Sequence, residues 1–427
     1  MQRRTFGLAL FTTLAARARA EAPANPAAAG DVAGAPLARR PAGGLDIHHL
    51  AMGRGNSTLV VGPDGTSILI DAGASADALD VSAAPRPDAS RRPGEWIARY
   101  AARRLCETGR DGLDVLLATH LHPDHLGDVV DASPRSRKGA YRLTGITDVA
   151  ELLPIGTLLD RGYPDYAYPE RWHAPFAQNY EAFVRARVQA GGRVERIAIG
   201  RRDQVVPAPA ACAQPAFEVR NVAANGVVWT GHGDETRALF PPLGSLKRED
   251  WPNENMCSIG LRIGLGRFAY FTGGDLTSYT VDGELPWHDV LGPAAHAAGP
   301  VDVATADHHG LFDGLDADVV RTLRPQAWVI PTWHISHPDT LQLERMLGTR
   351  LYAGPRQVFA TSVMHENLLA NARLMKQLAS TEGHVVVRVA PDGASFTVVV
   401  TSNADERDTV RACFGPYASR SEPPQPA

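Results

Sequence analysis

A dense group of potential metal ligands occupies residues 120–125. It contains three histidines and one aspartate, His120, His122, Asp124 and His125. Neutral imidazoles and carboxylates are ligands that first-row divalent metals accept, and this spacing lets the side chains of one tight loop converge from several directions. Neither an apolar core nor a solvated surface loop would require three histidines and an aspartate so close together. The group therefore predicts a metal site.

The elements that must position this group are strands. Residues 113–119 form a continuous apolar run of strand length that ends directly on the group. Earlier in the chain, short β-like runs occupy residues 45–51, 58–61 and 67–71, and residues 93–106 have apolar side chains at helical spacing. The metal-binding group is thus expected at the end of a strand in an α/β unit.

The second half of the chain repeats this arrangement. A hairpin over residues 257–272 ends at Gly273-Gly274-Asp275, and a strand over residues 301–306 ends at Asp307-His308-His309-Gly310. Further elements are expected as helices at 316–323 and 338–347, and as strands at 327–331, 384–389 and 395–400. Strands followed by helices, twice over, indicate two α/β halves that face each other.

The chain resembles the metallo-β-lactamase superfamily, whose hallmark is a His-x-His-x-Asp-His loop. Two further motifs agree with the resemblance: Ile68–Gly73, a strand that ends in Asp and Gly, and Gly273-Gly274-Asp275 at the end of a later strand. The resemblance covers about residues 45–400. It implies an α/β fold, a four-layer αββα sandwich.

Within that superfamily, the chain is most similar to the hydrolase domain of the competence protein ComEC and to phosphorylcholine esterases. Four motifs carry this finer resemblance: Gly53–Ser57, Asn255–Ser258, Asp307–Gly310 and His337-Pro338.

The resemblance implies a site with two adjacent divalent metal ions, expected to be zinc, with manganese or iron as alternatives. The first metal would be bound by His120 and His122. Asp124, His125 and His337 would bind the second, and Asp275 would bridge both. The implied metal ligands are His120, His122, Asp124, His125, Asp275, His308 and His337. The expected catalytic residues are Asp124, Asp275, His308 and His309. Asp71 is expected to hold a ligand histidine through a hydrogen bond.

One ligand position departs from the lactamase pattern. The separate histidine expected about twenty residues before the bridging aspartate is missing, and Asn255 occupies that spacing. His308 or His309 would then act at the site, as a ligand or as the acid that protonates a leaving group, with His308 slightly favoured. His232 is a weaker alternative.

A metal-bound hydroxide would make a protein nucleophile unnecessary, which agrees with the absence of a Gly-x-Ser-x-Gly motif. The first functional hypothesis is a hydrolase of a phosphodiester-type bond. A lactonase or β-lactamase type of hydrolase is the second hypothesis, and a non-catalytic metal-binding module is the third. Fold alone does not decide between the first two.

Composition restricts the partners. The 427 residues include 43 Lys plus Arg and 47 Asp plus Glu, a formal charge of −4. Stable non-specific binding to nucleic acid requires a strongly basic surface and is not expected. With no basic groove, the substrate is expected to be a small molecule. The oligomeric state is left open.

The ends of the chain carry export and linker features. Residues 1–20 resemble a twin-arginine signal peptide, with Arg3 and Arg4 before a short apolar stretch and a small-x-small cleavage site. Residues 21–44 are expected to be a flexible leader and residues 419–427 a disordered tail. A hydrolase domain over 45–418, without a membrane span after signal removal, would then be periplasmic or secreted.

A large insertion is expected at about 140–255, between the two halves. It carries an aromatic group that could act as a substrate lid or could cover a sheet edge. The group comprises Tyr163, Tyr166, Tyr168, Trp172, Phe176 and Tyr180. The four cysteines, Cys106, Cys212, Cys257 and Cys413, could pair or remain free thiols.

Overall fold

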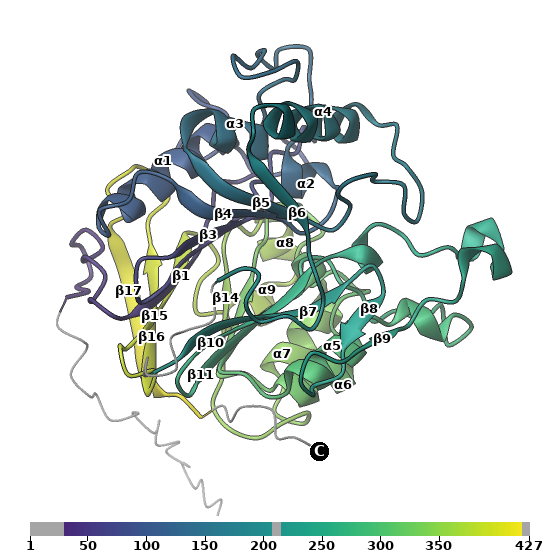
Figure 1. Cartoon of the computed structure of the whole chain (residues 1–427). Coiled ribbons are helices and arrows are strands. Elements are labelled where there is room, and N and C mark those ends of the chain that lie inside the picture. Colours follow the sequence, from purple (N-terminus) through teal and green to yellow (C-terminus); the bar gives the residue numbers. More distant parts are fainter. Residues whose placement is uncertain (1–29, 207–214, 421–427) are drawn as a thin grey trace, which may run out of the picture.

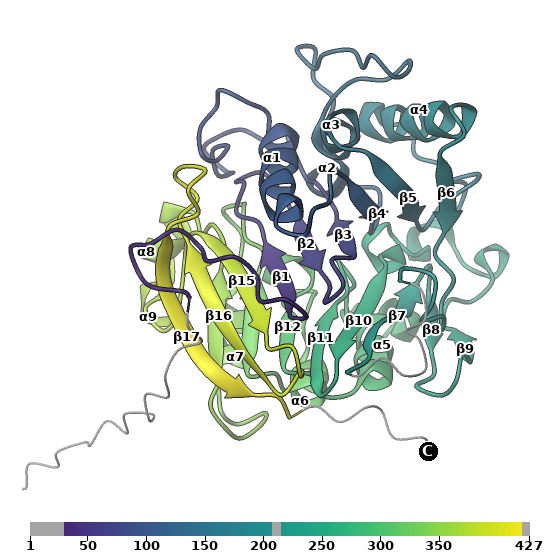
Figure 2. The same ribbon diagram turned by 60° about the vertical axis from the view of Figure 1, so that its left-hand side comes forward.

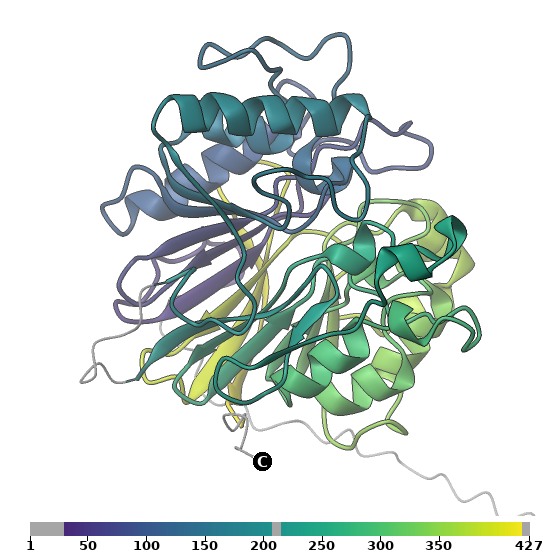
Figure 3. The same ribbon diagram turned by 45° about the vertical axis from the view of Figure 1, so that its right-hand side comes forward.

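Two large β-sheets stack face to face and are covered by helices on both outer sides (Figures 1 and 3). The structure is a computed structural model that describes residues 30–206 and 215–420. Within these ranges the first sheet has the order β17-β16-β15-β1-β2-β3-β4-β5-β6, and the second has the order β14-β13-β12-β11-β10-β7-β8-β9. This confirms the expected four-layer αββα sandwich.

The strands of the first sheet are β1 (Leu45–His49), β2 (Thr58–Val61), β3 (Ser67–Ile70), β4 (Leu113–Ala118), β5 (Ile155–Asp160), β6 (Arg193–Arg196), β15 (His384–Val389), β16 (Ser395–Thr401) and β17 (Val410–Ala418). Those of the second are β7 (Phe217–Ala224), β8 (Val227–Trp229), β9 (Thr236–Ala238), β10 (Gly260–Leu265), β11 (Phe268–Thr272), β12 (Val303–Thr305), β13 (Ala327–Ile330) and β14 (Gln357–Ala360).

The outer layers are helical. The first sheet is covered by α1 (Pro93–Cys106), α2 (Pro123–Leu126), α3 (Gly145–Leu152) and α4 (Pro175–Gln189). The second is covered by α5 (Leu291–Ala298), α6 (Ala317–Leu323), α7 (Thr340–Leu347), α8 (His365–Ala370) and α9 (Ala372–Met375). In the described part of the chain, none of these helices has the length and apolar character needed to cross a membrane.

Apolar side chains form three main layers of core. One cluster lies between the sheets and includes Ile47, Leu117, Val219 and Phe268. A second lies between the second sheet and its helices, and a third between the first sheet and α1, α3 and α4. Each sheet therefore buries both faces, which explains why strands such as β2 and β4 are nearly continuous apolar runs.

The range expected as an insertion, about 140–255, supplies strands to both sheets. β5 and β6 extend the first sheet in parallel beyond β4, and β7 pairs with β10 within the second sheet. Val219 and Val222 of β7 are fully buried. The strands of this range are therefore built into the two sheets and do not form a separate unit between the halves.

Three boundaries also differ from expectation. Residues 255–257 form a short 3₁₀ helix, so the hairpin begins at Gly260. Residues 30–44, expected within a flexible leader, pack beside β17: Leu37 is buried and its N–H bonds to the Asp408 carbonyl. Ser419 and Arg420 bond to Ala394 and Asp302, so the packed chain extends past 418 (Figure 2). The expected signal peptide and residues 421–427 lie outside the described residues.

The cysteines that the structure describes, Cys106, Cys257 and Cys413, are free thiols. Cys212 lies outside the described residues.

Two buried histidines of the first sheet predict acid sensitivity. Burial lowers the pKa of His49 and of His384 to about 3, and the Ala51 N–H donates to Nδ1 of His384, which must stay unprotonated. Because the folded pKa lies below the unfolded value of about 6.5, stability is complete above that pH and is lost as pH falls toward 3. From pH 7 to pH 5 the free energy of unfolding should fall by roughly 2 kcal/mol for each histidine. Denaturant titrations at the two pH values measure it, and a smaller loss in His384→Gln than in wild type is expected.

Candidate metal centre

Functional side chains from both sheets meet at one edge of the sandwich. β3 and β4 are parallel neighbours, and so are β11, β12 and β13. The residues that follow these strands therefore emerge at the same edge. Asp71 follows β3, the 120–125 loop follows β4, Asp275 follows β11, and the His308-His309 pair follows β12. The sequence separates these side chains by more than two hundred residues, but the strand ends bring them together.

One group of potential ligand atoms comprises Asp124, His125, Asp275 and His309, all within 4.8 Å of one another. Nε2 of His125 lies 3.2 Å from Oδ1 of Asp275 and 3.5 Å from Oδ2 of Asp124. Nε2 of His309 lies 2.9 Å from Oδ2 of Asp124. These four side chains can converge on one cation.

A second group comprises His120, His122 and Asp275. Nε2 of His120 lies 3.0 Å from Nδ1 of His122 and 3.7 Å from Oδ2 of Asp275. Asp275 is only 2% exposed and belongs to both groups. This is the position from which one carboxylate can serve two neighbouring cations.

The hydrogen bonding of His125 fits a metal ligand. Its Nδ1 lies 2.7 Å from Oδ2 of Asp71, so Nδ1 carries the proton and donates to this carboxylate. Its Nε2 is buried without a hydrogen-bond partner among the described residues, although two carboxylates face it. A lone pair opposed to two carboxylates requires a cation or a proton between them. The structure thus contains a hydrogen bond between Asp71 and one of the histidines that the sequence offers as ligands.

Electrostatics favour ionised carboxylates at Asp124 and Asp275 and neutral imidazoles at His120 and His122. Burial opposes the charge of Asp124 and Asp275, but His125 and His309 hold the pKa of each carboxyl well below its usual range. Burial lowers the pKa of His120 and of His122, so both imidazoles are neutral near pH 7. Burial opposes protonation of His125, yet Asp275, Asp124 and Asp71 raise its pKa well above the usual value. The carboxylates thus concentrate negative charge where a cation would sit.

The two adjacent histidines after β12 point to different partners. Both have left-handed backbones, with φ of 50° at His308 and 53° at His309. His309 enters the group with Asp124. His308 instead bonds through Nδ1 to Asp313 at 2.7 Å, and its Nε2 lies 3.1 Å from Nδ2 of Asn255 and 3.9 Å from Oδ2 of Asp275. The structure therefore groups His309, rather than the favoured His308, with the ligands.

Two other expected residues lie outside both groups. His337 is buried and stacks on the His309 ring at 4.7 Å between centroids, beside the group that contains His309. His232, in the loop between β8 and β9, belongs to neither group of candidate ligands found among the described residues.

Two glycines allow the metal-binding loop to approach the strand ends. A Cβ at Gly73 would lie 1.8 Å from the Asp124 carbonyl oxygen, and one at Gly55 would lie 2.3 Å from it. The Asn56 N–H donates to this same oxygen at 2.8 Å. A side chain at either position would displace Asp124. This close approach gives a reason for glycine at both positions beyond the formation of a tight turn.

The aromatic residues of the supposed lid divide between two roles. The hydroxyls of Tyr166 and Tyr180 donate to Asp160 at 2.6 and 2.9 Å inside the fold. Of these six described residues, only Trp172 has a ring contact with a candidate ligand: the centroid of its ring lies 5.3 Å from that of His122. The segment is therefore largely structural, and Trp172 is its contribution to the site.

Sequence reasoning missed a buried ion pair that supports the metal-binding loop. Oε1 of Glu254 accepts the Leu121 N–H at 2.7 Å and the Arg161 Nε–H at 2.6 Å, and Arg161 Nη2 pairs with Oε2. Leu121 lies between His120 and His122. Glu254 and Arg161 are 93 residues apart, so no local motif signals the pair.

Glu254→Gln should weaken metal binding without removing a ligand. A neutral amide leaves the buried Arg161 without its counter-charge and loosens the Leu121 backbone, so we expect roughly 10-fold weaker metal affinity. Calorimetric zinc titration measures this effect. Glu249→Gln, an exposed acid in the same loop, is the control. Equal zinc affinity in Glu254→Gln and wild type would show that the pair does not position the loop.

Residues 51–149 match the family model described as Metallo-beta-lactamase superfamily. This span contains Asp71 and the whole 120–125 group. Together with the His/Asp cluster, the match supports a metal-dependent hydrolase. No curated protein matches the chain.

Several solved structures are similar to this chain. The metallo-β-lactamase fold protein YhfI from Bacillus subtilis has 11% identity and a TM-score of 0.35, with 80% of this chain and 99% of that chain covered. A putative metal-dependent hydrolase from Parabacteroides distasonis has 13% identity and a TM-score of 0.34, covering 74% and 92%. A point mutant of the CmlA β-hydroxylase has 14% identity and a TM-score of 0.34; 67% of this chain is covered, and it spans 45% of that chain.

Proposed function

We propose that this protein is a two-metal hydrolase that cleaves a phosphodiester-type bond in a small molecule. The observation that carries the proposal is the position of Asp275, which belongs to both groups of candidate ligands. His120 and His122 would hold one cation with Asp275, and Asp124, His125 and His309 would hold the other. We propose zinc as the metal, since histidine and aspartate suit it.

When bound, two divalent cations lower the pKa of water from 15.7 to about 7 and offset negative charge on substrate oxygens. The protein's part is to fix the ligands. Asp71 keeps the proton of His125 on Nδ1, and Glu254 holds the loop between His120 and His122. Gly55 and Gly73 let Asp124 reach the site.

We propose that His308 gives a proton to the leaving group. Its Nδ1 is held by Asp313, which leaves Nε2 directed toward Asn255 and Asp275 at the edge of the site. An alkoxide leaving from phosphorus requires such a proton, and a histidine oriented by a carboxylate is a suitable donor. The resemblance of the His-His-Gly and His-Pro motifs to ComEC-like hydrolases and phosphorylcholine esterases also supports phosphodiester chemistry, and the absence of a basic composition favours a small substrate.

The proposal predicts hydrolysis of bis(p-nitrophenyl) phosphate by the zinc-loaded protein. Nitrocefin and a homoserine lactone are the comparison substrates for a lactamase or lactonase. Cleavage of either comparison substrate without cleavage of the phosphodiester would replace the proposed substrate class. Turnover of none of them by a protein with its full metal content would favour a non-catalytic metal-binding module.

His308→Gln tests the proton donor separately. The p-nitrophenolate group leaves readily without a proton, whereas a phenolate or alkoxide does not. The variant should therefore lose roughly 10²-fold or more in kcat on methyl phenyl phosphate and much less on bis(p-nitrophenyl) phosphate. Similar losses on both substrates would contradict proton donation by His308. Zinc content, measured in parallel, separates this role from metal binding.

We further propose that the enzyme is exported by the twin-arginine route. The support is the sequence of residues 1–20, in which Arg3 and Arg4 precede the apolar stretch. In a bacterial host, the protein should be recovered in the periplasmic or secreted fraction, and replacement of both arginines by lysine should retain it in the cytoplasm. Unchanged export of the double variant would contradict this route.

A further inference from the structure

A second cleft opens at the same edge of the sandwich as the metal centre. Its volume is about 720 Å³, within the range of small-molecule sites. Its walls come from the segment after β5, from the end of β6 and the residues that follow, from the turn between β7 and β8, and from β9 and Phe240. None of the candidate metal ligands lines it.

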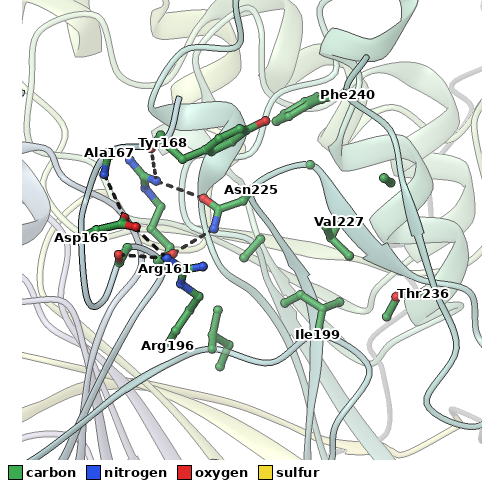
Figure 4. A pocket seen from close by; sticks show the side chains of 15 residues that line it. Arg161, Asp165, Ala167, Tyr168, Arg196, Ile199, Asn225, Val227, Thr236 and Phe240 are labelled. Atoms are coloured by element: carbon green, nitrogen blue, oxygen red, sulfur yellow. Dashed lines mark hydrogen bonds and ion pairs between the residues drawn. The ribbon is translucent and has the colours of Figure 1, made fainter. Parts of the chain in front are cut away.

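The body of the cleft suits a flat apolar group. Figure 4 shows the Tyr168 and Phe240 rings along one side and the Ile199 and Val227 side chains on the other. Aromatic and branched aliphatic walls bind a planar ring through apolar burial and ring contacts.

The walls are fixed before any ligand binds. Arg161 Nη1 donates to the Tyr168 carbonyl at 2.9 Å and to Oδ1 of Asn225 at 3.0 Å. Asn225 and Gly226 form the β7–β8 turn with φ of 52° and 69°. A Cβ at Gly226 would lie 2.3 Å from the Phe240 ring, so glycine there allows this ring its position. Arg161 is also paired with Glu254. Its charge is therefore already balanced and is not the one that would bind a ligand.

A cationic group with spare donors lies at the same cleft. Arg196 is held by bonds from Nε to the Tyr163 carbonyl and from Nη2 to the Gly162 carbonyl. No hydrogen bond of its Nη1 is found with any residue in the described ranges. The nearest acid, Asp165, is 3.7 Å away and is 64% exposed. Because this pair is weak, the guanidinium can donate hydrogen bonds to the carboxylate of a ligand in place of Asp165.

We propose that this cleft is a binding site for a small aromatic carboxylate. The ring would lie between the Tyr168–Phe240 side and the Ile199–Val227 side, and the carboxylate would accept hydrogen bonds from Arg196. The proposal is independent of the hydrolase function, because it involves none of the candidate metal ligands.

Calorimetric titration of the full-length zinc-loaded protein with 2-naphthoate tests the site. Arg196→Gln should weaken binding by about two- to fivefold, since it removes a partly exposed charge. Asp165→Asn should strengthen binding, because it removes the acid that competes for Arg196. Ala238→Trp should abolish binding, since Ala238 is an exposed residue of edge strand β9 that lines the cleft.

The neutral analogue 2-naphthamide supplies the matched control ligand. Its affinity should not change in Arg196→Gln or Asp165→Asn. Arg193→Gln, an exposed arginine of β6 outside the cleft, should leave both affinities unchanged. No binding of 2-naphthoate by wild type, or equal binding by wild type and Ala238→Trp, would overturn the site. Equal responses of the acid and the amide to Arg196→Gln would overturn the carboxylate assignment.

Discussion

Asp275→Asn should remove most of the bound metal and almost all of the hydrolytic activity. The substitution keeps the size of the side chain but removes the only carboxylate that belongs to both groups of candidate ligands. Loss of a residue that merely orients a ligand costs roughly 10–100-fold in metal affinity or activity, so loss of a shared anionic ligand should cost more than about 100-fold. Metal content by atomic spectroscopy and phosphodiester turnover measure the two effects.

Asp128→Asn is the matched control for this substitution. Asp128 follows the metal-binding loop, is partly buried, and belongs to neither ligand group. Its variant should keep the wild-type metal content and activity. If Asp275→Asn bound as much zinc as Asp128→Asn and wild type, Asp275 would not be a shared ligand.

Asp71→Asn should weaken metal binding although Asp71 is not among the candidate ligands. Asp71 accepts hydrogen bonds from the Thr119 N–H and hydroxyl at 2.8 Å and from His125 Nδ1 at 2.7 Å. An amide NH₂ facing His125 would favour the tautomer with its proton on Nε2, the atom directed at Asp124 and Asp275. The lone pair needed for the metal would then be lost, so we expect roughly 10–100-fold weaker zinc binding.

A tautomer effect can be distinguished from general loss of structure. Asparagine tolerates the left-handed backbone of this position, which has φ of 60°, so the strand end should keep its conformation. Nitrogen NMR shifts of His125 report which ring nitrogen is protonated. Thr119→Ser keeps the hydroxyl bond to Asp71 and should retain the tautomer and zinc affinity. An unchanged His125 tautomer in Asp71→Asn would refute the mechanism, even if zinc affinity fell.

The sequence predicted the parts of the fold whose signal is local. β2 and α1 were located with their exact bounds and β4 to within one residue, because buried strands and an amphipathic helix have characteristic apolar patterns. The same pattern placed the 120–125 group at a strand end. Short edge strands were missed. β6 reads Arg-Val-Glu-Arg and β9 reads Thr-Arg-Ala, so their polar side chains carry no alternation and only their pairing identifies them.

The sequence singled out the side chains that the structure brings together in the two candidate groups, but it did not determine how each of them is oriented. His308 and His309 are adjacent, and spacing does not determine which ring turns toward Asp124. The left-handed backbone at both residues and the Asp313 carboxylate decide it. The Arg161–Glu254 pair depends on two loops that the sheets bring together, a long-range contact without a sequence signal.

Zinc titration of the chelator-treated protein, with bound metal and bis(p-nitrophenyl) phosphate hydrolysis followed together, tests the two-metal hydrolase most directly. We predict that two zinc ions bind per chain and that hydrolysis reaches its maximum only when the second has bound. Full hydrolysis by metal-free protein, or saturation of binding at one zinc or fewer per chain, would contradict a two-metal site built around Asp275.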